Sequence, residues 1–186
     1  MRRKLLGILL LGFASGLPYM LVFSTLTAWL RDVGISLTEI GFFAWLVLTY
    51  SLKFLWAPFV DRYSIPGFKV FGKRRGWILF SQSVIFISLI GMSLVDPLQN
   101  IQILALFAFF AAFFGSIQDV AVDALRIEIG EAKEQGDLAA SYQLGYRVAI
   151  LVATSMALIF ADLYSWTYVY QLMGSLMLIG SAGALI

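Results

Sequence analysis

The chain has 186 residues, of which 61% are hydrophobic and 13% are charged, and its formal net charge is +2. Soluble domains carry about 25% charged residues, so this composition excludes an ordinary soluble domain. Cysteine and histidine are both absent. The usual zinc and haem sites and a disulfide framework are therefore not expected, and no other metal or cofactor is predicted.

Six apolar stretches are each about as long as a membrane-spanning helix, which needs about 20 residues to cross about 30 Å of hydrocarbon. In chain order they cover 5–30, 40–60, 77–95, 101–126, 142–161 and 166–186. The core of a soluble protein can supply one or two such stretches, but not six. The sequence therefore predicts an all-α integral membrane protein in which residues 1–186 form one bundle of six transmembrane helices.

Three basic residues, Arg2, Arg3 and Lys4, precede the first stretch, as they do in a secretory signal peptide. This stretch is about twice as long as a typical signal core, and no small-residue cleavage site follows it. A retained first span is therefore expected.

The first stretch also contains Gly12, Gly16 and Pro18. Small residues four positions apart allow two helices to approach closely. Pro18 has no N–H to donate to the carbonyl of Ala14, so a kink or local unwinding is expected at mid-membrane depth. Transporters place such breaks beside their substrate, which makes Gly16 and Pro18 candidate pathway residues. A packing kink without a ligand is the alternative.

Positively charged residues gather in loops that an alternating topology places on one side of the membrane. They are Arg2, Arg3, Lys4, Arg62, Lys69, Lys73, Arg74, Arg75, Arg126 and Lys133. Only Arg31 lies on the other side, while Lys53 and Arg147 lie within spans. Because positive loops stay in the cytoplasm, both termini are predicted to be cytoplasmic. These residues indicate contact with the lipid bilayer and not with nucleic acid.

Two carboxylates, Asp119 and Asp123, interrupt the fourth stretch near its end, and Arg126 follows them. On a helix, one wedge of about 100° contains Ala112, Gly115, Ser116, Asp119, Asp123 and Arg126. The opposite side carries Phe110, Phe113, Phe114 and Ile117. Ionisable groups inside a membrane are costly, so the acidic stripe is expected to face protein or water at a functional site.

Three charged residues lie at similar depths in different spans. At the helical rise, Lys53 and Asp119 lie about 10 Å inside the cytoplasmic end of their spans, and Arg147 lies about 8 Å inside. Opposite charges at equal depth can neutralise each other. We expect Asp119 to respond to protons or cargo with Arg147 as its partner, and Asp123 to form a structural pair with Arg126. A salt-bridge network that only holds helices together is the alternative.

Paired carboxylates could also serve an intramembrane enzyme as acid and base. Arg126 and Arg147 would instead neutralise them, and no nucleophile or metal constellation accompanies them. The chain is therefore not expected to be an enzyme.

Four segments together resemble one known family, the anhydromuropeptide permeases of the major facilitator superfamily. They are LGFASGLP at 11–18, YSLKFLWAP at 50–58, QDVAVDALR at 118–126 and GYR at 145–147. Asp61 and Arg62, followed by Gly72–Arg75, are similar to the loop between helices two and three of the superfamily. That loop differs from the usual pattern, because Ala57 replaces its leading glycine and the spacing to the basic cluster is longer.

The resemblance implies a proton-coupled importer in the bacterial inner membrane that carries N-acetylglucosaminyl-anhydromuramyl peptides, which are glycopeptides, into the cytoplasm for cell-wall recycling. The candidate residues of the proton and cargo pathway are Gln118, Asp119, Asp123, Arg147, Lys53, Gly16 and Pro18. The resemblance also suggests a gate in which the loop at Asp61 and Arg62 makes a charge contact with Arg126.

The superfamily uses twelve helices in two six-helix bundles with the pathway between them. This chain therefore resembles one amino-terminal half of a transporter. A lone bundle would expose its transport face to lipid, so a separate carboxyl-terminal half or a second copy is an expected partner. The alternatives are a non-transporting membrane fragment or assembly subunit, and a transporter for another cargo such as acetyl-CoA.

Overall fold

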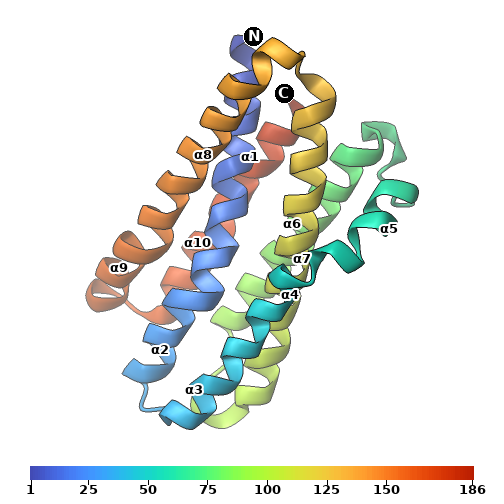
Figure 1. Ribbon diagram of the computed structural model, residues 1–186. Helices are drawn as coiled ribbons and strands as arrows, with labels where there is room; N and C mark the ends of the chain where they lie inside the picture. Colours follow the sequence, from blue (N-terminus) through green and yellow to red (C-terminus); the bar gives the residue numbers. More distant parts are fainter.

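A computed structural model describes all 186 residues, and every regular element in it is helical. The long helices run side by side, and both termini lie at the same end of the molecule (Figure 1). The elements are α1 (Arg2–Met20), η1 (Leu21–Thr25), α2 (Leu26–Asp32), α3 (Leu37–Phe43), η2 (Ala44–Leu46), α4 (Val47–Ser51), η3 (Lys53–Leu55), α5 (Ala57–Arg62), η4 (Lys69–Phe71), α6 (Lys73–Ser93), α7 (Pro97–Ile129), η5 (Ala132–Glu134), α8 (Gln135–Leu151), η6 (Val152–Met156), α9 (Ala157–Leu163) and α10 (Trp166–Leu185).

Five helical segments are long and apolar enough to cross a membrane. They are Arg2–Asp32, Lys73–Ser93, Pro97–Ile129, Ala132–Leu163 and Trp166–Leu185. A sixth crossing results if Leu37–Ser51 and Lys53–Arg62, which meet at a bend of 40°, count as one span. The predicted all-α membrane fold is confirmed, and each predicted span overlaps one of these segments.

The broken helix is the second span and not the first. The first span continues through Pro18, widens into the π-helical turn η1 and goes on as α2. The expected unwinding at Pro18 does not occur, and the irregularity of this span is the π-turn that follows it at Leu21–Thr25. In the second span, Pro58 lies in the first turn of α5. The bend of 40° lies before it, at Leu52 between Ser51 and Lys53, and Pro58 is tolerated because the first turn of a helix needs no N–H donor.

The first span packs closely against α8, as the glycine spacing predicted. A Cβ atom on Gly12 would lie 2.2 Å from the carbonyl oxygen of Tyr142, and one on Gly145 would lie 2.0 Å from that of Leu9. Only glycine fits at either position, so the backbones of α1 and α8 touch.

The core lies between α1, α6, α7 and α10, where Leu17, Ile85, Leu89, Ala108 and Met173 are buried. In the most apolar stretch of the first span 67% of the residues are buried, whereas in that of the span formed by α8 and α9 only 22% are buried. The face of α8 that points away from α1 is therefore open.

Candidate functional site

The acidic stripe of α7 faces α1, and Asp119 lies buried in it with 8% of its surface exposed. The hydroxyl groups of Ser15 on α1 and Tyr142 on α8 are its polar neighbours, and Lys53 and Asp123 interact with it electrostatically. Its Oδ1 atom nevertheless has no hydrogen-bond partner. The structure thus places one incompletely satisfied carboxylate where three spans and the broken helix meet.

Gln118 extends this polar cluster within the contact between α1 and α7. Its side chain is fully buried, and Nε2 donates a long hydrogen bond of 3.4 Å to Oγ of Ser15. The Gln118 Oε1 atom has no partner. Buried polar atoms in proteins are nearly always satisfied, so two free acceptors on adjacent residues mark this position as unusual.

Four tyrosine rings form a wall beside the carboxylate. Tyr50, Tyr142 and Tyr146 all lie within the range of the Asp119 charge. The ring centroid of Tyr19 lies 5.0 Å from that of Tyr50 and 6.5 Å from that of Tyr146. All four residues are half-buried, so their rings form an aromatic surface at the edge of the site.

Gly115 makes room for one of these tyrosines. A Cβ atom at Gly115 would lie 2.2 Å from the Tyr50 hydroxyl oxygen, which itself has no hydrogen-bond partner. The small residue one turn before Asp119 therefore admits a polar group from the broken second span.

The second half of that broken span is fastened to α7 near the site. The Trp56 indole donates a hydrogen bond of 3.0 Å to Oγ of Ser116, and its ring lies 4.9 Å from that of Phe113. These contacts hold η3, and with it Lys53, against the acidic stripe.

The structure does not join Asp119 to Arg147, the partner expected from the sequence; Lys53 is the cation whose charge acts on Asp119, although no ion pair links the two side chains. Arg147 is exposed and takes part in no ion pair. Gly145 faces α1, and a residue two positions later points about 200° away from it on a helix. The rotation of α8 thus turns Arg147 out of the bundle.

The predicted pair of Asp123 with Arg126 is present within α7. The two side chains lie 3.6 Å apart at a spacing of three residues, and the Asp123 side chain is 46% exposed. An ion pair this exposed contributes little to stability.

The predicted gate contact between Asp61 and Arg126 is replaced by a different arrangement. Arg74 binds Asp61 at 2.5 Å and Glu128 at 2.8 Å, and so links α5, α6 and α7. The loop reverses at Gly67 and Gly72, which both have φ near +87°, and this brings Arg74 back to the end of α5. Arg62 is exposed and forms no ion pair.

Gly16 faces a helix and not an open site. A Cβ atom there would lie 2.8 Å from the carbonyl oxygen of Tyr146 and 3.0 Å from Cβ of Ala149. Pro18 is buried beside the contact of α1 with Gly115. In this structure both residues pack between helices, as the packing alternative describes, and their role in a cargo pathway stays a prediction.

Sequence reasoning missed Ser15 and the tyrosines. Tyr142 and Tyr146 lie one turn apart on α8, a spacing that indicates a shared face. Nothing in the sequence pattern points to Tyr19 or Tyr50. No three Asp or Glu residues gather where they could hold a metal ion.

Comparison with known proteins identifies the family. A sequence profile described as Major Facilitator Superfamily matches residues 8–186. The chain belongs to the major facilitator superfamily. The resemblance seen in the sequence motifs is confirmed: the chain is similar to the anhydromuropeptide permease of Escherichia coli K12, with 40% identity over 172 residues, which cover 92% of this chain.

Two further relatives are similar to nearly the same degree. A putative AmpG-type transporter of Rickettsia felis is 36% identical over 86% of the chain, and an uncharacterised protein of Haemophilus influenzae is 39% identical over 96%. The matched residues make up 34%, 39% and 41% of these three relatives. The chain thus spans between a third and two fifths of the length of the curated relatives it matches.

Proposed function

We propose that this chain acts as the amino-terminal half of a proton-coupled importer of anhydromuropeptides in a bacterial inner membrane, with both termini in the cytoplasm. Similarity to proteins named anhydromuropeptide permease supports this class of cargo. The termini share one end of the bundle (Figure 1) with the basic loops, which supports the orientation.

One observation carries the proposal: the buried Asp119 carboxylate has an oxygen without a hydrogen-bond partner and no ion pair, and Lys53 is the cation whose charge acts on it. Such a group is costly in the membrane interior and is retained where it exchanges a proton or binds a ligand. Proton uptake by Asp119 would remove its attraction to Lys53 at the bend of the second span. Movement of that half-span would then couple proton entry to opening of the pathway.

The tyrosine wall supports binding of a small molecule beside this group. Ligand sites combine aromatic and apolar walls with a few polar atoms that fix orientation. Here the rings of Tyr19, Tyr50 and Tyr146 supply the wall, while Asp119 and Gln118 supply free acceptors. The named relatives are permeases and transporters, so we infer transport of this ligand without chemical change.

A partner bundle completes the pathway in this proposal. The outer face of α8 exposes Leu144, Arg147, Val148 and Leu151, and the broken span exposes Trp45, Leu48 and Phe54. An exposed arginine within a span is costly in lipid and is accommodated where it faces protein or water. A carboxyl-terminal half or a second copy of the chain would supply that environment.

Reconstitution tests the proposal. Proteoliposomes would contain this chain alone, or this chain with the carboxyl-terminal half of the Escherichia coli relative, and uptake of a labelled anhydromuropeptide would be followed under an inward proton gradient. We expect gradient-driven uptake by the paired form. Uptake by the chain alone would assign the partner role to a second copy. Absence of uptake in both preparations would favour a non-transporting subunit, and uptake of acetyl-CoA only would reassign the cargo.

A further inference from the structure

A cavity of about 240 Å³ lies at the end of the bundle that carries both termini and is lined by α1, α6, α7 and α10, and Asp119 is not among its lining residues. One water occupies about 30 Å³ in the liquid, so the cavity has room for a larger group. Its apolar lining consists of Ile8, Leu11, Leu125, Ile129, Ala184 and Ile186, and its charged lining consists of Arg3, Lys4 and Arg75.

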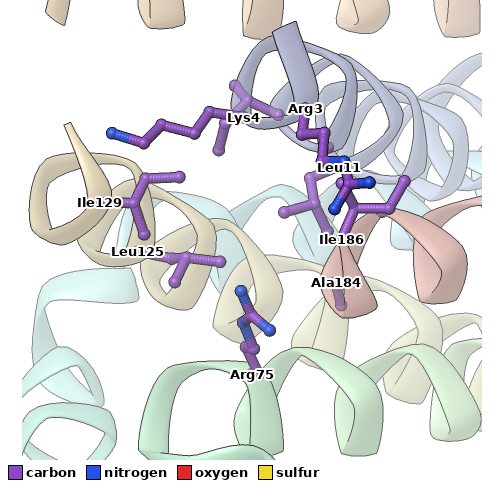
Figure 2. A pocket seen from close by; sticks show the side chains of 11 residues that line it. Arg3, Lys4, Leu11, Arg75, Leu125, Ile129, Ala184 and Ile186 are labelled. Carbon is purple, nitrogen blue, oxygen red and sulfur yellow. The ribbon is translucent and has the colours of Figure 1, made fainter. Parts of the chain in front are cut away.

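The charged side chains that line this cavity are all positive, and two of them form no ion pair with another side chain. Figure 2 shows Arg3 and Arg75 reaching toward the same space from different helices, whereas Lys4 points to one side. Lys4 binds Glu134 at 3.0 Å, but neither Arg3 nor Arg75 belongs to any of the ion pairs in the chain. No acidic residue lines the cavity.

The two helices that supply these arginines add to the positive potential. Both α1 and α6 begin at this end, and neither has an acidic residue in its first turn or a side-chain cap. A helix amino terminus carries a partial positive charge that favours anions. Arg3 and Arg75 lie in these first turns, so their side chains add to the positive potential that favours an anion here.

We propose that this cavity binds the headgroup phosphate of an anionic phospholipid, with Arg3 and Arg75 as its ligands. A guanidinium group holds phosphate through two parallel hydrogen bonds. The aliphatic walls from Leu125, Ile129 and Ile186 suit the glycerol and the first carbons of an acyl chain, which a free phosphate ion lacks. Basic pockets between membrane helices near the cytoplasmic surface are suited to such headgroups.

The test measures thermal unfolding of the purified 186-residue chain in detergent during titration with phosphatidylglycerol, phosphatidylcholine or inorganic phosphate. We expect phosphatidylglycerol to stabilise the unaltered chain. In Arg3→Ala, and separately in Arg75→Ala, its apparent affinity should fall about fivefold, since one basic residue near anionic lipid contributes about 1 kcal/mol. Arg2→Ala and Lys69→Ala remove the same charge outside the cavity and should titrate like the unaltered chain.

Several outcomes would overturn the site. Equal weakening in all four variants would show a diffuse surface effect, and equal stabilisation by phosphatidylcholine would remove the need for an anion. Stabilisation by inorganic phosphate at the same concentrations would assign the cavity to a free anion. Because Arg75→Ala also removes an aliphatic stem, Arg75→Gln is measured beside it, and retention of full phosphatidylglycerol affinity in that variant would also contradict the proposal.

Discussion

The Trp56 indole donates a hydrogen bond of 3.0 Å to Ser116 Oγ, and this contact ties the broken second span to α7 one turn from Asp119. Ser116 in turn donates to the carbonyl oxygen of Phe113 at 2.7 Å. The bond holds η3 in place, so Lys53 reaches the acidic stripe although it lies on a half-exposed segment of 3₁₀ helix.

Replacing Trp56 by Phe should lower stability by about 1 kcal/mol, because the hydrogen bond is lost while an aromatic ring remains against Phe113. Thermal unfolding of the purified chain in detergent measures this, with an expected shift of about 2–4 °C. Trp45→Phe is the matched control, since Trp45 is 70% exposed. Equal shifts in the two variants would mean that the bond to Ser116 does not hold the span.

The contact between α1 and α8 gives a second prediction. In Gly12→Ala the new Cβ atom meets the backbone of Tyr142, so one helix must shift, at a cost of about 1–3 kcal/mol. Gly41→Ala adds the same atom within α3, where nothing lies within 4 Å. Alanine is favoured over glycine in a helix by about 1 kcal/mol, so Gly41→Ala should not destabilise the chain. A tolerated Gly12→Ala would show that the helices lie further apart.

The Arg74 bridge predicts a ranking of three variants. Arg74→Gln releases two carboxylates, whereas Asp61→Asn releases one partner, so Arg74→Gln should destabilise the chain more. Both carboxylates are about half exposed, so each contact is expected to contribute below about 1 kcal/mol and to weaken in high salt. Arg126→Gln should leave the bridge intact. Chemical unfolding at low and high salt measures the ranking. A larger loss of stability in Arg126→Gln than in Arg74→Gln would instead support the contact between Asp61 and Arg126 that the sequence suggested.

Cysteine labelling tests the orientation of the bundle, because the natural chain contains no cysteine. Single cysteines at the exposed positions Ser36, Ser64 and Asn100 sample both ends. Ser64 is preferred to the neighbouring Gly67, whose φ of +86° suits glycine. We expect an impermeant reagent added outside intact cells to label positions 36 and 100 but not 64. Labelling at position 64 alone would show that the bundle has the opposite orientation.

Local sequence patterns were sufficient for the features that depend on one helix. The apolar stretches predicted the spans, and helical periodicity put Asp119, Gly115 and Ser116 on one buried face. The same periodicity found the pair of Asp123 with Arg126, since both residues lie on α7. In each case the relevant neighbours are close in the chain.

Features that depend on how separate helices are rotated could not be predicted in this way. Equal depth suggested that Arg147 meets Asp119, but depth says nothing about which face of α8 turns inward. Likewise, Ile117 lies on the side opposite the acidic stripe but is only 4% exposed, because this end of α7 packs into the cluster with Ile8 and Ile78. Tertiary contacts decided both positions.

Lys53 and Arg147 can be compared directly as candidate partners of Asp119. Lys53→Met should reduce gradient-driven uptake by the paired transporter more than about tenfold, because it removes the cation whose charge acts on the Asp119 carboxylate. Arg147→Met removes an equal charge at a similar depth and should leave coupling unchanged. If uptake, measured in the same proteoliposomes, fell more in Arg147→Met than in Lys53→Met, Arg147 and not Lys53 would be the partner of Asp119 in proton coupling.

The most direct test of the central claim is the transport behaviour of Asp119→Asn in the paired form. The amide cannot release a proton, so we expect it to abolish accumulation driven by the proton gradient while exchange of labelled cargo across the membrane continues. Asp123→Asn is the matched control, because its side chain is half exposed and paired with Arg126, and it should accumulate cargo normally. Normal gradient-driven accumulation by Asp119→Asn would contradict the assignment of Asp119 as the coupling group.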